Sequence, residues 1–240
     1  MSDVFYKDKL IWEHNIRTFE KEFLTMFPDI QLPEYNINFV DEIDNINYSM
    51  QVLHTKNPMV LNVNIGHMLD KNFNYKSILA HEFTHMNDYY TLLNEKDKKF
   101  KSKALFLYTE YHATYVQAQY LFSKHNNVGC IMENILESEL LIQENIDSFN
   151  KNTNLNSWNG ILHGYMYYFA YVDFYNSLDE KYKMKHFDFQ NDSALYDLYN
   201  CIALHIQSDS FWELCYKIQL FLDKSILIQL YKIENPRKSE

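Results

Sequence analysis

The sequence predicts an α+β fold that is mostly helical, with a small N-terminal β-sheet and a helical C-terminal half. Long helices are indicated because the 240 residues include only four Gly and four Pro, so few positions interrupt a regular backbone. A strand is indicated before Gly66, where apolar residues occupy every second position at Met59, Leu61, Val63 and Ile65. Hydrophobic residues make up 47% of the chain, which is enough for a substantial core.

The remaining elements follow from the spacing of apolar residues. Recurrence at steps of three and four predicts helices over residues 6–27, 75–93, 103–123, 131–149, 158–178 and 210–233. Weaker strand patterns cover residues 35–40 and 48–53. We therefore expect a core of residues 1–125, with an N-terminal helix and the small sheet, and a helical region of residues 126–240 packed on it as one unit.

A short motif in the predicted helix over residues 75–93 has the spacing of a metal site. In His81-Glu82-Phe83-Thr84-His85, the two histidines lie four positions apart, so one helical turn brings both imidazoles to the same metal. Glu82 projects beside them. A shuffled chain of this composition would contain roughly 0.03 such motifs, which disfavours chance.

The motif also lies on the side of its helix that favours ligand binding. Leu79, Phe83 and Met86 belong to one apolar stripe, and both histidines fall on the opposite side of the helical wheel. Another element must then cover the histidine face and could supply a third ligand. Catalytic zinc sites take three protein ligands and leave the fourth position to water.

Glu110 and His112, in the predicted helix over residues 103–123, are the alternatives for that third ligand. They lie about 200° apart on the helical wheel, so both can hardly reach one metal. Glu110 is favoured because it shares its face with Ala113 and Thr114, whose small side chains allow close helix packing. The plain alternative for Glu110 is a solvated helix glutamate.

These residues together resemble a known family. The first motif, followed by Glu110-Tyr111-His112-Ala113 on a later helix, is similar to the zinc site of the gluzincin metallopeptidases, most of all the compact ImmA/IrrE-like group. The resemblance covers residues from about 35 to 122. It implies a zincin-like catalytic core in which His81, His85 and Glu110 bind zinc and Glu82 is the general base. It also implies that an edge strand of the sheet binds the substrate.

A catalytic residue outside the zinc motifs is suggested in the predicted helix over residues 158–178. His163 and Tyr165 stand among apolar residues, and gluzincins often use such a His or Tyr to stabilise the oxyanion. His163 is our candidate for that role. The plain alternative is a core histidine with a satisfied hydrogen bond, which is the more common situation.

Charge and composition exclude several other classes. The formal charge of −10 weighs against nucleic-acid binding, which depends on clustered Lys and Arg. We expect no membrane span, because no stretch reaches eighteen uncharged apolar residues. The first residues lack the order of a secretory signal, and Cys130, Cys201 and Cys215 form no CxxC pair, so we expect a cytoplasmic protein.

The function predicted from the sequence is zinc-dependent hydrolysis of peptide bonds. With Zn²⁺ held by the three ligands, Glu82 would take a proton from water and pass it to the leaving amine. We expect a polypeptide substrate, narrow intracellular specificity and possible control by a regulatory protein partner. The alternatives are a non-hydrolytic zinc-binding regulatory or interaction protein, and an all-helical interaction module whose motif is accidental.

Overall fold

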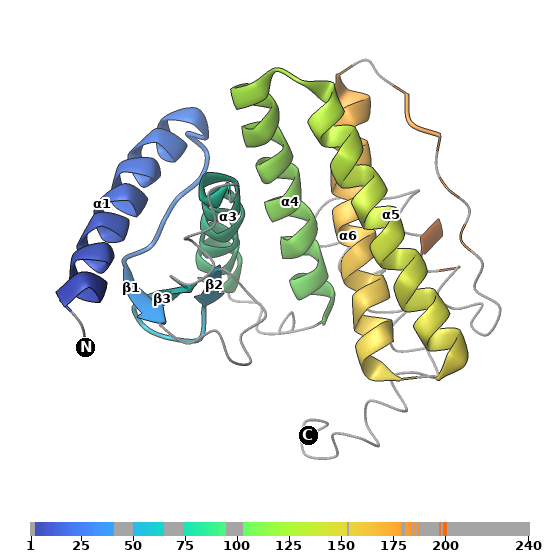
Figure 1. Ribbon diagram of the computed structural model, residues 1–240, viewed down its shortest axis with the longest axis horizontal. Coiled ribbons are helices and arrows are strands. Elements are labelled where there is room, and N and C mark those ends of the chain that lie inside the picture. Colours follow the sequence, from blue (N-terminus) through green and yellow to red (C-terminus); the bar gives the residue numbers. More distant parts are fainter. Residues whose placement is uncertain are drawn as a thin grey trace. The chain divides into compact units, whose positions relative to one another are not determined.

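The computed structural model describes residues 3–40, 50–64, 74–94, 103–152, 154–178, 181–183, 185, 187, 197, 199 and 200 (Figure 1). Over these residues the fold is mostly helical, with five helices and one small three-stranded sheet, as the sequence predicts. The predicted helix over residues 210–233 lies outside this part of the chain. The chain divides into two compact units, Met1–Lys98 and Lys99–Glu240, which are described one at a time.

The first unit contains two helices and the sheet (Figure 1). Its elements are α1 (Asp3–Met26), β1 (Tyr35–Val40), β2 (Met50–Leu53), β3 (Met59–Asn64) and α3 (Tyr75–Asn94). The predicted helix over residues 75–93 is confirmed almost to the residue. The strand predicted for residues 35–40 has those bounds in the structure, and the alternating segment forms β3.

The sheet has the strand order β1-β3-β2, with β3 parallel to β1 and antiparallel to β2. The alternating apolar residues of β3 lie on one face of the sheet and the residues between them on the other, because successive side chains of a strand point to opposite sides. Leu61 and Val63 of β3 are fully buried on the apolar face. On the opposite face, Asn62 accepts a hydrogen bond of 2.9 Å from its cross-strand neighbour Asn38. β2 forms one edge of this sheet.

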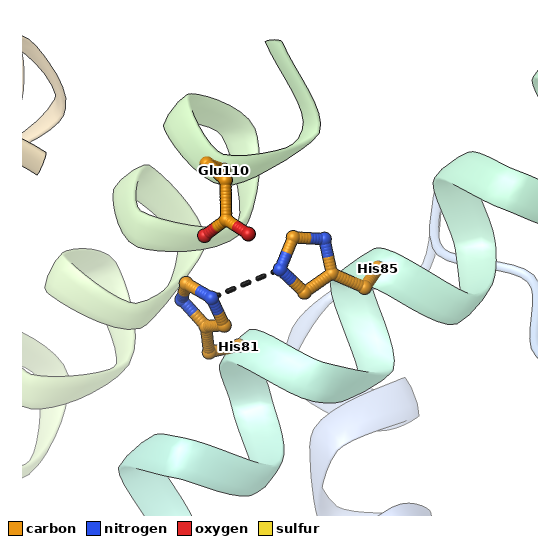
Figure 2. A group of neighbouring side chains, drawn as sticks. All are labelled: His81, His85 and Glu110. Atoms are coloured by element: carbon orange, nitrogen blue, oxygen red, sulfur yellow. Dashed lines mark hydrogen bonds between the residues drawn. The ribbon is translucent and has the colours of Figure 1, made fainter. Parts of the chain in front are cut away.

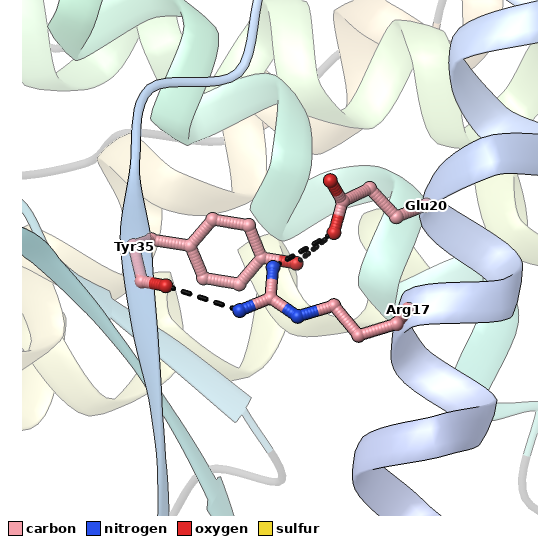
Figure 3. A network of polar contacts seen from close by, with 3 residues as sticks. All are labelled: Arg17, Glu20 and Tyr35. Atoms are coloured by element: carbon pink, nitrogen blue, oxygen red, sulfur yellow. Dashed lines mark hydrogen bonds and ion pairs between the residues drawn. The ribbon is translucent and has the colours of Figure 1, made fainter.

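A polar network ties α1 to the start of β1, the other edge of the sheet (Figure 3). The Tyr35 hydroxyl donates to Glu20 Oε2 at 2.6 Å, and Arg17 donates to the same oxygen at 2.9 Å. Arg17 also donates to the Tyr35 carbonyl at 3.1 Å, while its guanidinium lies 4.2 Å from the centroid of the tyrosine ring. Burial and the Glu20 carboxylate raise the pKa of Tyr35. The network therefore fixes β1 against α1.

The apolar face of α3 is buried inside the first unit. Phe83 lies within 5.5–6.1 Å, centroid to centroid, of the rings of Phe19 and Phe23 on α1 and Tyr35 on β1. Leu79, Phe83 and Met86 are fully buried. This packing fixes the rotation of α3 about its axis, so the side opposite Phe83 carries the two histidines.

The second unit contains three long helices, α4 (Lys103–His125), α5 (Val128–Lys151) and α6 (Leu155–Ser177) (Figure 1). Short polar connections separate them: Asn127 caps α5 by accepting from Gly129 N, and Asn154 caps α6 by accepting from Ser157 N at 2.8 Å. The helices α5 and α6 meet closely at Gly164, because a Cβ there would lie 2.6 Å from Ile142 Cγ1.

The structure groups α4 with the helices that follow it, whereas the sequence analysis ended the first part at residue 125. The reason is the contacts of α4 with α6. Tyr111 donates to Asp173 at 2.8 Å, and the rings of Tyr115 and Phe122 both contact Phe174. Glu110 is thus carried by a helix that packs with α6 inside the second unit.

Candidate metal centre

His81 and His85 converge on one point beside α3. Their Nε2 atoms lie 3.0 Å apart (Figure 2). Two nitrogens that each bind zinc at about 2.0–2.1 Å with tetrahedral angles are separated by about 3.3 Å, so the pair is already near the spacing of shared ligands. Thr84, between them in sequence, is buried and donates to the Ala80 carbonyl at 2.8 Å, which satisfies its hydroxyl within the helix.

Glu110 completes a group that could hold a metal ion. His81, His85 and Glu110 each offer one ligand atom, and these atoms all lie within 4.8 Å of one another (Figure 2). Two imidazole nitrogens and one carboxylate oxygen suit zinc and leave a fourth coordination position for water. His112 is not a member of this group; its ring lies 6.2 Å from that of Tyr108.

Glu82 is held by the edge strand of the sheet. Its Oε2 accepts a hydrogen bond of 3.0 Å from the main-chain N–H of Val52 on β2, and the bond is buried. The residue predicted to act as a base is therefore fixed in position beside the two histidines and at the outer edge of β2.

Asn87 and Asp88 follow His85 within one turn of α3. The Asn87 side chain accepts from Gln31 N at 2.8 Å and donates to Asp88 Oδ1 at 3.0 Å. Asn87 thus joins α3 to the segment between α1 and β1. Asp88 is buried next to it and receives one of its hydrogen bonds.

His54 lies near the centre and was missed by the sequence analysis. Its ring stacks on Tyr89, with 3.8 Å between centroids and 14° between planes, and Tyr89 stacks at 6.1 Å on His85. Burial and the charge of His85 both lower the pKa of His54. The signal for Tyr89 was present, because His81, His85 and Tyr89 follow one another at steps of four along α3.

The predicted oxyanion candidates lie on different sides of α6. Tyr165 is fully buried, and its ring contacts Phe169 and Tyr199 in the core of the second unit. His163 is half-buried, with its ring 5.2 Å from that of Phe106 on α4. The side chain with a hydrogen bond to Glu110 is one the sequence analysis did not name: the Tyr167 hydroxyl donates to Glu110 Oε2 at 3.4 Å.

Comparison with known proteins returned no significant match to a protein-family model, a curated protein or a solved structure. Among the helices within the described ranges, none is long and apolar enough to cross a membrane.

Proposed function

We propose that this protein is a zinc-dependent metallopeptidase with a zincin-like catalytic core. The observation that carries the proposal is the group of His81, His85 and Glu110, with Glu82 adjacent and anchored to an edge strand. These residue types correspond to the ligands and the general base of a zinc hydrolase. His112 is outside the group, which favours an open catalytic site over a closed site with a fourth protein ligand.

The donor set fits zinc in number and kind. The two histidines offer Nε2 atoms already 3.0 Å apart, and the Glu110 carboxylate adds an anionic oxygen. When bound, zinc supplies a water of lowered pKa and polarises the carbonyl that is attacked. His81, His85 and Glu110 would hold the ion.

Glu82 performs the proton transfers. The Val52 N–H fixes one carboxylate oxygen, so the side chain is held in position for proton transfer. Glu82 takes a proton from the attacking water and then gives it to the nitrogen of the leaving amine. Burial of Glu82, which is 8% exposed, limits competing exchange of this proton with bulk solvent.

The position of Val52 supports an extended polypeptide as the substrate. Its N–H points to Glu82 and away from β3, so the outer main-chain groups of β2 lie beside the catalytic base. An extended peptide could add to this edge by main-chain hydrogen bonds, which would bring its carbonyls next to Glu82. We further propose narrow specificity for one or a few intracellular proteins and control by a regulatory protein partner.

The test is a search for new protein termini in cells that express the wild type or Glu82→Gln. The proposal predicts a small set of termini that depend on Glu82, and cleavage of the same proteins in vitro that a chelator abolishes and zinc restores. If zinc is bound through His81 and His85 but no termini depend on Glu82, the non-hydrolytic zinc protein is the correct reading. Rapid degradation of unfolded proteins in general would contradict the narrow specificity.

A further inference from the structure

One row of α6 differs from the rest of that helix. Between Trp158 and Tyr175, α6 is mostly buried, yet Asn159, His163 and Tyr167 are each half-buried. They follow one another at steps of four and so lie on one face. All three carry groups that donate or accept hydrogen bonds, which a packing face does not require.

This row lies against the row of α4 that carries Glu110. The ring of His163 lies 5.2 Å from that of Phe106, and one turn further along both helices the Tyr167 hydroxyl donates to Glu110. The second contact lies four residues further along each helix than the first. Both contacts therefore belong to the same interface between α4 and α6 within the second unit. Tyr167 packs partly against the core of this unit and lies opposite the Glu110 carboxylate.

We propose that Tyr167 is a positioning residue for the metal ligand Glu110; the inference rests on the proposed zinc site. A glutamate side chain has several rotatable bonds, and the hydrogen bond from the hydroxyl to Oε2 restricts them. Outer partners of this kind orient a ligating carboxylate, and their loss typically weakens metal binding 10- to 100-fold, as an order of magnitude. The 3.4 Å bond is long, as hydrogen bonds at such sites often are before the site is loaded.

The same pair of helices provides a matched control. Tyr111 on α4 donates to Asp173 on α6 at 2.8 Å, which is also a phenol-to-carboxylate bond, but neither residue belongs to the metal-ligand group. Tyr111→Phe and Tyr167→Phe therefore remove the same atom from the same helix pair. A structural role for Tyr167 predicts similar behaviour of the two variants.

The experiment measures the zinc Kd by competition with a chelator and the thermal stability of the metal-free protein. We expect Tyr167→Phe to raise the Kd roughly 10- to 100-fold with little change in metal-free stability. Tyr111→Phe should lower stability and leave the Kd within about twofold of the wild type. A Kd for Tyr167→Phe equal to that of the wild type would overturn the inference.

Two further variants separate this inference from the zinc site itself. In a Glu110→Ala background, Tyr167→Phe should cause no additional loss of zinc affinity, because the hydroxyl acts only through Glu110. An equal loss in both backgrounds would overturn the positioning role. If His81→Ala weakens zinc binding and Tyr167→Phe does not, the site stands and only the role of Tyr167 fails. If His81→Ala has no effect, both proposals fail.

Discussion

The carboxylate of Glu82 on α3 accepts a hydrogen bond of 3.0 Å from the main-chain N–H of Val52 on β2. The bond joins the helix that carries the two histidines to the edge of the sheet. Because the donor is a main-chain group, the identity of residue 52 matters less than the placement of the strand. The sheet therefore positions the proposed catalytic base, and the following predictions depend on this arrangement.

Glu82→Gln should retain zinc and lose hydrolysis by several orders of magnitude. The amide oxygen can still accept from Val52 N–H, so the shape of the site is kept while the base is removed. Metal content and peptide cleavage should be measured on the same preparation. Glu22→Gln is a suitable control, because that carboxylate forms a surface ion pair with Lys76 at 3.0 Å and its loss should leave cleavage unchanged. Cleavage by Glu82→Gln at the wild-type rate would remove Glu82 from the mechanism.

The third ligand is tested by comparing Glu110→Ala with His112→Ala. Glu110 is in the group with both histidines, whereas the His112 ring lies near Tyr108. Glu110→Ala should weaken zinc binding by at least tenfold, and His112→Ala should leave it within about twofold. Calorimetric or chelator-competition titration of both variants distinguishes the two ligands. The opposite ranking would show that His112, and not Glu110, binds the metal.

Gly164→Ala should destabilise the contact between α5 and α6. A helical Ala is favoured over Gly by about 1 kcal/mol, but its Cβ would lie 2.6 Å from Cγ1 of the fully buried Ile142. Overpacking of this kind costs about 1–3 kcal/mol, so we expect a net loss of stability in urea unfolding. In an Ile142→Ala background the same change should stabilise the protein. A gain of stability in the wild-type background would show that the helices separate without cost.

Stability should fall at alkaline pH because buried tyrosines resist ionisation. Burial is the main cause that raises the pKa of Tyr168 from 10.0 to about 12, and it raises the pKa of Tyr111 and Tyr171 in the same direction. Below pH 10 the folded and unfolded states both keep the proton of Tyr168. Between pH 10 and about pH 12 only the folded state keeps it, so the free energy of unfolding falls by up to about 1.4 kcal/mol per pH unit for this residue.

The alkaline effect is measured by urea unfolding between about pH 9 and pH 11, with phenolate absorbance recorded on the native protein. Tyr168→Phe should reduce the slope of stability against pH in this range. Native tyrosines that all ionise near pH 10 would contradict the assigned burial.

The parts of this molecule that depend on local spacing were predictable from sequence. The pairing of His81 with His85 follows from the helical repeat, and the strand over residues 35–40 follows from its apolar pattern. The grouping of α4 with α6 was not predictable, because it depends on contacts such as Tyr111 with Asp173, which lie 62 positions apart.

In the candidate site, too, local spacing was predictable from the sequence and long-range contacts were not. The helix α6 is apolar on nearly every face, so the spacing of its apolar residues does not show which side chains enter the core. Tyr165 is buried in the core, whereas the Tyr167 hydroxyl donates to Glu110. His54 had no signal of its own, since its stacking on Tyr89 depends on how β2 packs against α3. Long-range packing, and not local pattern, selects among such side chains.

Elemental analysis of the purified protein shows whether the proposed metal site exists. The account predicts about one zinc per chain in the wild type and loss of the metal in both His81→Ala and His85→Ala, because each variant removes one of the two Nε2 ligands that lie 3.0 Å apart. His125→Ala, which changes an exposed histidine in the last turn of α4, should retain the metal. Equal zinc content in the wild type and both α3 variants would contradict the site and, with it, the proposed peptidase.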